Sequence, residues 1–170
     1  MKAKKVFLSQ PVKRSLKFGA DLLSNSGFET AGAGGVDVFA NWVETIVIGL
    51  STVERAIDSV SEGTYSCKFT KGEGDAKGVY QDITVIPGKL YRLLFYTRGD
   101  ATNAGSYSVY DITNSADIVA EVTTGITGTS YSAVSNLFVT PVDCVSIRVT
   151  LLGGSAGVVY FDDVSVSPGN

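Results

Sequence analysis

The last predicted strand, Gly157 to Val166, contains a carboxylate, Asp162, among apolar residues. It reads GVVYFDDVSV, and in a strand successive side chains point to opposite faces. Alternation predicts an apolar face around Asp162, whose other members are Val158, Tyr160, Val164 and Val166. A charge among buried apolar neighbours is costly unless it is paired, hydrogen-bonded or bound to a metal. The segment Asn25 to Glu29, NSGFE, offers a candidate partner near the start of the chain.

The other reactive side chains do not form a recognisable catalytic set. The chain has no histidine, which excludes Ser-His-Asp and Cys-His chemistry and any histidine-ligated metal. A glycosidase needs two carboxyl groups that face each other across about 5 to 10 Å, whereas Asp162 and Asp163 are neighbours pointing to opposite faces. Asp111, Asp117 and Glu121 show no arrangement, and no nucleophile-elbow motif occurs. We therefore expect no enzymatic activity.

The two cysteines are Cys67 and Cys144. In the stretch YSCKF, Cys67 alternates with polar neighbours and is expected to point inward beside Tyr65 and Phe69. A buried free thiol packs as a small hydrophobe. A disulfide would require the two Cα atoms to lie within about 7 Å, which the sequence does not reveal. Both alternatives stay open, and the spacing does not match a zinc site.

Charge is unevenly divided along the 170 residues. Residues 1–20 hold six basic side chains and no acidic one, whereas the rest of the chain holds eight basic and 17 acidic ones, a net charge of −9. An acidic body argues against nucleic acid as a partner. The longest apolar run of the basic segment, Val6 to Leu8, is too short for a signal peptide, and no stretch is long enough to span a membrane. We therefore expect neither secretory export nor membrane insertion.

A basic tip on an acidic body is typical of a docking arm. Pro11 and the scattered lysines oppose a helix there. We predict an extended docking arm over residues 1–20 and one folded domain over residues 21–170; the alternative is a disordered tail. The arm residues expected to contact a protein partner are Lys5, Phe7, Leu8, Arg14 and Phe18.

From Asp21 onward, short β-type stretches alternate with turn signals. The sharpest signal is Pro87-Gly88, which predicts a hairpin between the strands on either side of it. The AGAGG segment at 31–35 is expected to be a flexible loop. The predicted strands cover 42–50, 53–57, 65–70, 78–85, 90–98, 106–112, 118–123, 133–139, 145–152 and 157–166. Many short strands without a long helix predict an all-β fold, a two-sheet antiparallel sandwich.

Several of these stretches, in this order, resemble the carbohydrate-binding modules found beside xylanases and glucanases. The stretches are NSGFE, the following Trp42, GTYSCKF, VYQDITVIPGKLYRLLFYTRG and YFDDVSV. The resemblance covers Asp21 to Val166 and implies a β-jelly roll of the galactose-binding-like superfamily. A shared fold does not by itself establish sugar binding.

In that family a calcium ion commonly ties the two ends of the chain together. The resemblance implies a structural Ca²⁺ held by the side chains of Glu29 and Asp162. Backbone carbonyls near Ser26 and around Glu62 to Tyr65 would complete a shell of about six to eight oxygens. The alternative is that Asp162 caps a loop by accepting hydrogen bonds from backbone N–H groups.

The resemblance also implies glycan binding by aromatic rings flanked by amides and carboxylates on one sheet face. In the stretch 90–98, alternation assigns Tyr91, Leu93 and Phe95 to the core and leaves the intervening side chains outside. The predicted cleft consists of Tyr80, Asp82, Tyr96, Arg98 and Tyr110. The alternatives are that these tyrosines are ordinary strand residues, or that they form a protein-binding face. Trp42 is expected in the core.

Two classes of function follow. The first is a non-catalytic virion or assembly surface protein, of the capsid-decoration or head or tail fibre type. Such a protein would assemble in the host cytoplasm as a homo-oligomer, dock on a capsid or tail protein through residues 1–20, and present its jelly roll to glycans. The second is a free-standing, extracellular carbohydrate-binding module of a polysaccharide-degrading system. The missing signal peptide favours the first.

Overall fold

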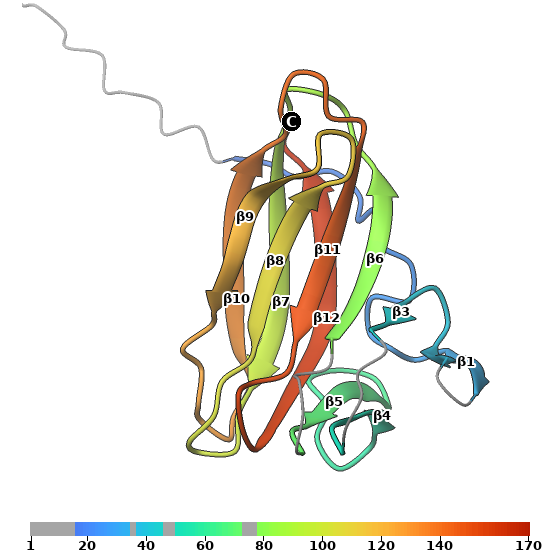
Figure 1. Cartoon of the computed structure of the whole chain (residues 1–170), viewed down its shortest axis with the longest axis vertical. Helices are drawn as coiled ribbons and strands as arrows, with labels where there is room; N and C mark the ends of the chain where they lie inside the picture. Colours follow the sequence, from blue (N-terminus) through green and yellow to red (C-terminus); the bar gives the residue numbers. More distant parts are fainter. Residues whose placement is uncertain (1–15, 35–36, 46–49, 73–77) are drawn as a thin grey trace, which may run out of the picture.

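The computed structural model describes residues 16–34, 37–45, 50–72 and 78–170. All regular secondary structure in these ranges is β-strand, which confirms the all-β prediction (Figure 1). The strands in the described ranges are β1 (Ala31–Gly34), β2 (Asp37–Phe39), β3 (Val43–Glu44), β4 (Thr52–Ala56), β5 (Ser66–Thr70), β6 (Gly78–Thr84), β7 (Leu90–Arg98), β8 (Ser106–Asp111), β9 (Ala116–Thr123), β10 (Ser132–Val139), β11 (Ser146–Leu152) and β12 (Val158–Pro168).

Two five-stranded antiparallel sheets face each other, as expected of a jelly-roll sandwich (Figure 1). The β7 sheet has the order β10-β7-β12-β5-β4, and the β11 sheet has the order β3-β6-β11-β8-β9. Strands β1 and β2 form a separate two-stranded ribbon. Three loops, β7–β8, β9–β10 and β11–β12, gather at the end of the sandwich opposite the C-terminus.

The first part of the domain departs from the prediction. The segment 31–35 was expected to be a loop, but Ala31 to Gly34 form β1, because Ala31 pairs with Phe39 and Ala33 donates its N–H to Asp37 Oδ2 at 2.7 Å. The predicted strand 42–50 is much shorter: only Val43 and Glu44 are strand, and residues 46–49 lie outside the described ranges.

The core lies between the two sheets and is rich in aromatic rings. Phe95 of β7 packs against Tyr107 of β8 and Phe161 of β12, with ring centroids 5.3 and 5.6 Å apart. A second group, Phe28 with Phe39 and Trp42, fills the space beneath the N-terminal segment, so Trp42 is in the core as expected. Offset and edge-on ring pairs of this kind add to the stabilisation that burial itself provides.

Strand β12 contains an irregularity that the sequence pattern did not reveal. The pairing with β7 shifts by one residue between Asp162 and Ser165, and Asp163 has a left-handed φ of 49°. An extra residue in one strand is a β-bulge, which reverses the faces of all residues beyond it. Val164 and Val166 therefore join Phe161 in the core. The predicted face of Val158, Tyr160, Asp162, Val164 and Val166 is thus wrong: Asp162 points to the outer side of the β7 sheet, as does Tyr96 opposite it.

The start and the end of the domain lie side by side. Leu22 donates its N–H to Val166 O at 2.9 Å, and Val164 donates to Ser26 O at 3.0 Å. Further along, Gly19 donates to Pro168 O and Asn170 donates to Lys17 O. The last residues of the predicted arm thus run along the C-terminal end of β12, while Lys5, Phe7, Leu8 and Arg14 lie outside the described residues.

Both cysteines are buried free thiols, and Cys67 points into the core as expected. Burial raises the pKa of Cys67 well above its ordinary value and that of Cys144 to about 11, so neither thiol is a reactive thiolate near neutral pH. Within the described ranges, no helix with the length and apolar character required to cross a bilayer occurs.

Candidate functional site

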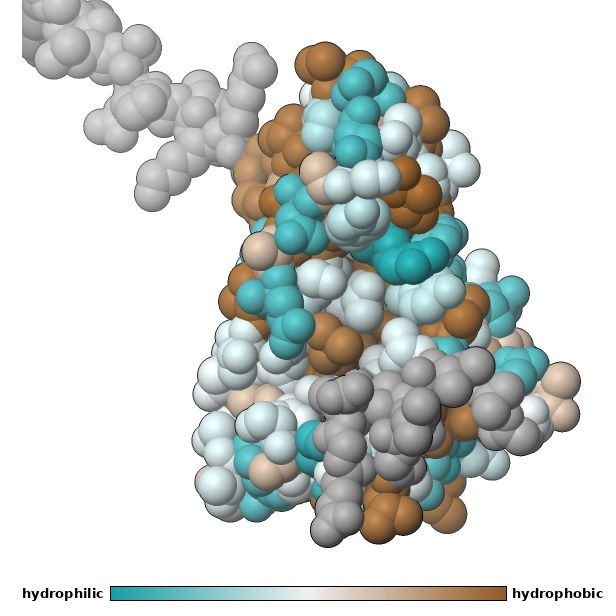
Figure 2. Space-filling view, viewed as in Figure 1, coloured by the Kyte–Doolittle hydropathy of each residue, from teal (hydrophilic) through white to brown (hydrophobic). Residues whose placement is uncertain are grey.

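The outer face of the β11 sheet carries a row of polar and aromatic side chains from three adjacent strands. On β6, buried Val79 and Gln81 alternate with Tyr80 and Asp82, which point outward. Arg148 of β11 stands opposite Asp82 on one side and opposite Tyr110 of β8 on the other. Figure 2 shows this side of the molecule, where hydrophilic residues (teal) alternate with residues of intermediate hydropathy (white) and hydrophobic residues (brown).

Arg148 is the centre of this row, although the sequence analysis did not single it out. Its Nε donates to Asp82 Oδ1 at 2.7 Å and its Nη2 donates to Asp82 Oδ2 at 2.9 Å, a bidentate pair. The same guanidinium lies 3.8 Å above the ring of Tyr80. The hydrogen bonds to Asp82 raise the pKa of Arg148, so the group is charged at every physiological pH. We name the set Tyr80, Asp82, Arg148 and Tyr110 the arginine platform.

The arginine platform has the chemical groups that sugars need. Tyr80 and Tyr110 are half-buried and supply ring surface for apolar contact, while the ion pair supplies donors and acceptors for hydroxyl groups. Thr150 of β11 lies between Tyr80 and Ser108 in the next row of the same face. The side chains of Arg148 and Asp82 are 37% and 41% exposed, which leaves them open to a ligand.

The other two members of the predicted cleft lie elsewhere. Tyr96 and Arg98 belong to β7, and their outward faces are on the opposite side of the sandwich from Tyr80, Asp82 and Tyr110. The single cleft predicted from the sequence is therefore corrected to two separate surfaces. The physical reason is that β6 and β7, although consecutive in sequence, cross from one sheet to the other at the Pro87-Gly88 turn rather than forming a hairpin.

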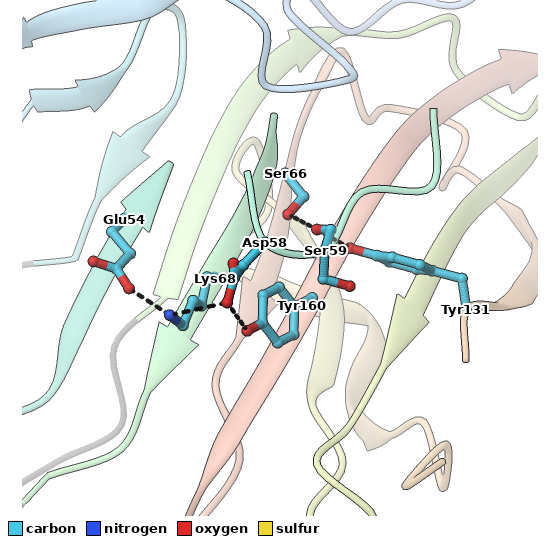
Figure 3. Close-up of polar contacts among 7 residues, drawn as sticks. All are labelled: Glu54, Asp58, Ser59, Ser66, Lys68, Tyr131 and Tyr160. Atoms are coloured by element: carbon cyan, nitrogen blue, oxygen red, sulfur yellow. Dashed lines mark hydrogen bonds and ion pairs between the residues drawn. The ribbon is translucent and has the colours of Figure 1, made fainter. Parts of the chain in front are cut away.

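Arg98 takes part in a polar cluster that holds the segment after β4 against the β7 sheet. Its guanidinium lies 4.1 Å from the ring of buried Tyr160, whose hydroxyl donates to Asp58 Oδ2 at 3.0 Å. Figure 3 shows Lys68 between Glu54 and Asp58, with N–O distances of 2.9 and 3.7 Å.

The same segment is held a second time, by Ser59. Its carbonyl accepts hydrogen bonds from the hydroxyls of Ser66 and of Tyr131, the latter at 3.0 Å (Figure 3). Burial raises the pKa of Tyr131 to about 12, so this phenol stays protonated and remains a donor. Because Ser59, Ser66 and Tyr131 satisfy one another, these contacts have a structural role.

The two carboxylates expected to bind calcium both cap the loop that follows this segment. Asp162 Oδ2 accepts from the N–H of Ser61 at 2.7 Å and of Glu62 at 3.4 Å. Glu29 Oε1 accepts from the N–H of Thr64 at 2.8 Å and of Tyr65 at 3.1 Å. Within residues 61–65, N–H groups rather than carbonyl groups face the two carboxylates. This is the loop-capping arrangement that the sequence analysis gave as the alternative to calcium.

Asp162 is fully buried, and desolvation raises its pKa to about 6 although three backbone N–H groups donate to it. The bulge brings Asp163 to the same place: a Cβ on Gly27 would lie 3.7 Å from Asp163 Oδ1, 3.9 Å from Asp162 Oδ1 and 3.7 Å from Glu29 Cγ. Asp163 Oδ2 is buried and has no hydrogen-bond partner among the described residues.

The donor chemistry of this carboxylate group fits a hard cation. Carboxylate and carbonyl oxygens are the ligands that calcium takes, in irregular geometry. A buried carboxylate oxygen without a partner, as on Asp163, is a group that a cation would satisfy. Among the described residues, however, no three side chains of His, Cys, Asp or Glu are arranged to hold a metal ion by themselves. Backbone carbonyls such as Ser26 O would have to supply the remaining ligands.

A further polar pocket opens where the three loops gather. It has a volume of 440 Å³ and lies between the β7–β8, β9–β10 and β11–β12 loops. Two of its lining residues, Ser106 and Thr123, are a cross-strand pair of β8 and β9, so the pocket adjoins one edge of the β11 sheet.

The fold is a β-jelly roll of the architecture found in carbohydrate-binding modules. No protein-family model matches the chain, and no curated protein matches it in sequence. Among solved structures, it is similar to TmCBM61 in complex with β-1,4-galactotriose, with 24% identity, a TM-score of 0.63, and coverage of 87% of this chain and 98% of that one. It is also similar to the CBM22-1 xylan-binding domain from Paenibacillus barcinonensis Xyn10C, with 16% identity, a TM-score of 0.61, and coverage of 91% and 97%.

A phage protein contains the same architecture. The enzymatically active domain of bacteriophage CBA120 tailspike protein 4 matches 87% of this chain with 15% identity and a TM-score of 0.64, and this chain spans only 21% of the tailspike chain. At such identities the likeness shows the fold alone. The jelly roll expected from the sequence motifs is thereby confirmed.

Proposed function

We propose that this chain is a non-catalytic carbohydrate-binding protein that takes a glycan on the outer face of the β11 sheet. The observation that carries the proposal is the arginine platform, in which one guanidinium is fixed between a carboxylate and an aromatic ring on an exposed sheet face. The similarity to modules solved with galactotriose and named for xylan supports the ligand class. Catalysis is not part of the proposal, because both carboxylate oxygens of Asp82, the one carboxylate of the arginine platform, are paired with Arg148.

In this proposal the platform residues have separate roles. Tyr80 and Tyr110 contact the apolar faces of sugar rings. Asp82 accepts hydrogen bonds from sugar hydroxyls with the lone pairs that Arg148 leaves free, and Arg148 donates to ring or hydroxyl oxygens with its remaining N–H groups. The mutual pairing of Asp82 and Arg148 pre-organises both groups, which lowers the entropy cost of binding.

We further propose that the module is a homo-oligomeric virion surface protein, of the capsid-decoration or fibre type, which assembles in the host cytoplasm and docks on a capsid or tail protein through residues 1–20. Exposed apolar side chains lie at the end of the sandwich that carries the C-terminus (Figure 1), and they support docking there. Val142 is 87% exposed, and Ile86, Val139 and Val145 are exposed beside it. Hydrogen bonds between the loops that carry them, such as Val85 N to Val145 O, place them together. Brown atoms mark this upper end in Figure 2.

Phe18 is the one predicted docking residue within the described chain, and it is half-buried with the guanidinium of Arg92 4.4 Å from its ring. The occurrence of the same fold in a phage tailspike supports the virion assignment. The second candidate function is an extracellular module of a polysaccharide-degrading system. That candidate is favoured by the similarity to an α-L-arabinofuranosidase, of which this chain spans 26%.

We also propose that Glu29, Asp162 and Ser26, joined by Asp163, hold a structural Ca²⁺. The support is the buried, unpartnered Asp163 Oδ2 and the carboxylates around Gly27. When bound, the ion would neutralise carboxylates at the junction of the chain start with β12.

The glycan proposal is tested by a matched pair of tyrosine variants. Tyr110→Ala removes a ring from the platform, and Tyr96→Ala removes a ring from the opposite sheet. On an array that contains β-1,4-galactotriose and xylohexaose, we expect Tyr110→Ala to weaken binding by about fivefold, which corresponds to about 1 kcal/mol for one ring contact, and Tyr96→Ala to leave it unchanged. Equal losses in both variants, or no binding by the unmodified protein, would reject the proposal.

A further inference from the structure

The pocket at the loop end of the sandwich is rigidly built. Behind the lining residues Thr102 and Asn103, Asp100 accepts hydrogen bonds from their N–H groups and from that of Val158, which ties the β7–β8 loop to the start of β12. Gly99 and Ala101 donate to Gly128 O and Thr127 O at 2.9 and 2.8 Å, which ties the same loop to the β9–β10 loop.

Close packing fixes the third loop. A Cβ on Gly154 would lie 2.7 Å from Ala104 O, so the β11–β12 loop can approach the β7–β8 loop closely only with glycine at this position. Gly157 has a φ of 68°, and a Cβ there would overlap the side chains of Asp100 and Asn103. A pocket whose walls are held by such contacts is formed before any ligand arrives, which favours affinity.

The lining of the pocket is polar, nearly uncharged and without rings. It presents the hydroxyls of Thr102, Thr127 and Ser155, together with one carboxylate, Glu121. The amide nitrogen of Asn103 donates to both carboxylate oxygens of Asp100, at 3.1 and 3.0 Å. The Oδ1 of Asn103 is therefore left as an acceptor for a ligand. Within the described ranges, the Glu121 carboxylate makes no hydrogen bond or ion pair.

This chemistry selects the ligand class. The lining contains no Lys or Arg, and its single charge is negative, which disfavours phosphate, sulfate and uronate groups. Two acceptors and several hydroxyls match a ligand that carries many hydroxyl donors, namely a neutral sugar. The volume of 440 Å³ equals that of about fifteen water molecules at roughly 30 Å³ each, which is room for a mono- or disaccharide. Volumes of this size are typical of small-ligand sites.

The pocket lies in line with the arginine platform. On β8, Ser106 of the pocket, Ser108 and Tyr110 of the platform are alternate residues on one face. We propose that the pocket receives the terminal neutral sugar of a glycan that lies across the platform, with Glu121 and Asn103 accepting its hydroxyl protons. The inference rests on the proposed function and adds that the module recognises chain ends.

The test is a titration of ¹⁵N-labelled full-length protein, followed by NMR, with arabinose, β-1,4-galactotriose and xylohexaose, and with trigalacturonic acid as an anionic counterpart. We expect the neutral sugars to shift the amide signals of residues 102–106, 125–127 and 153–155, and trigalacturonic acid to leave them unchanged. Glu121→Gln is expected to weaken galactotriose binding tenfold or more, because it removes a charge-assisted acceptor. Ser155→Trp, which fills the pocket, should abolish the shifts there.

Two control variants separate the outcomes. Thr52→Trp adds the same ring at an exposed position on β4 and should change nothing. If Tyr110→Ala weakens binding while Glu121→Gln and Ser155→Trp do not, the pocket inference is overturned and the platform stands. If the two pocket variants weaken binding and Tyr110→Ala does not, the pocket is a site of its own and the platform is not one. Absence of any shift up to about 10 mM sugar, above the Kd of a weak site, would overturn both.

Discussion

Arg148 and Asp82, on adjacent antiparallel strands, form a two-pronged ion pair on an open sheet face, with N–O distances of 2.7 and 2.9 Å. More than a third of each side chain is exposed. At such exposure water screens the attraction, so the pair adds little to the stability of the fold. In the proposed function, the pair instead presents its remaining donors and acceptors to a glycan.

Replacement of Arg148 by methionine should separate binding from stability. We expect the free energy of unfolding to change by less than about 1 kcal/mol, because the ion pair is exposed. Binding to β-1,4-galactotriose should fall strongly, since Asp82 and Tyr80 lose their shared partner. Chemical denaturation and affinity electrophoresis measure the two effects. Lys68→Met, which removes the ion pair with Glu54 on the other sheet, is the matched control and should leave glycan binding intact.

Asp162 predicts an unusual pH dependence when metal is absent. Burial raises its pKa in the folded protein to about 6, above the ordinary value of 3.8, so the folded state binds more protons than the unfolded state between these values. Stability therefore rises as pH falls through 6, by about 1 kcal/mol between pH 7 and pH 5. Denaturation in the presence of a chelator measures this gain, and Asp162→Asn should remove it. A wild-type curve that is flat or falls over this interval contradicts the prediction.

Acidification below that window should act in the opposite direction. Asp100 accepts hydrogen bonds from Val158 and Asn103, which hold the pKa of its carboxyl well below the ordinary value. The stabilisation that it provides is present above its unfolded pKa of 3.8 and is lost as pH falls through its lower folded pKa. The pH profile should thus have a maximum near pH 4, and Asp100→Asn should flatten its acidic side without affecting the rise between pH 7 and pH 5.

Calcium binding predicts a metal response that depends on the same carboxylates. Free Ca²⁺ at about 100 times its Kd would stabilise the fold by about 2.7 kcal/mol and raise Tm, and a chelator would reverse the effect. Asp162→Asn and Glu29→Gln should each lose the response, whereas Asp37→Asn, in the β1–β2 ribbon and hydrogen-bonded to Ala33 N, should keep it. A calcium effect of equal size in Asp162→Asn would place the ion elsewhere, and the carboxylates would then serve only as caps of the loop 61–65.

The docking arm predicts different results for two deletions. Removal of residues 1–15 should leave Tm unchanged, whereas removal of residues 1–20 should lower stability by about 2 kcal/mol. The longer deletion loses two backbone hydrogen bonds and the contact of Phe18 with Arg92. Both deletions should prevent incorporation into the proposed virion, measured by co-sedimentation. Incorporation of the 1–15 deletion at the normal level would reject the arm as the docking element.

Much of the architecture was predictable from local sequence pattern. Alternation assigned Tyr91, Leu93 and Phe95 to the core, and all three are buried. The Pro87-Gly88 turn lies between two strands as expected, but the predicted hairpin is wrong because these strands belong to different sheets. Trp42 is in the core. These features were predictable because period-two burial and turn chemistry depend on neighbours in the sequence.

The candidate sites depended on information that no local pattern contains. The order of the strands in each sheet places Tyr80 and Tyr110 on the same face as Arg148 and places Tyr96 on the opposite side of the sandwich. One extra residue at Asp163 inverted the second half of β12 and moved Asp162 from the expected core to the outer side of its sheet. The loop pocket joins residues from three separate connections. The sequence by itself therefore determined that this is a β-sandwich with an acidic body and a basic start; strand order, register and loop packing arise from contacts between distant residues, and only the tertiary structure decided them.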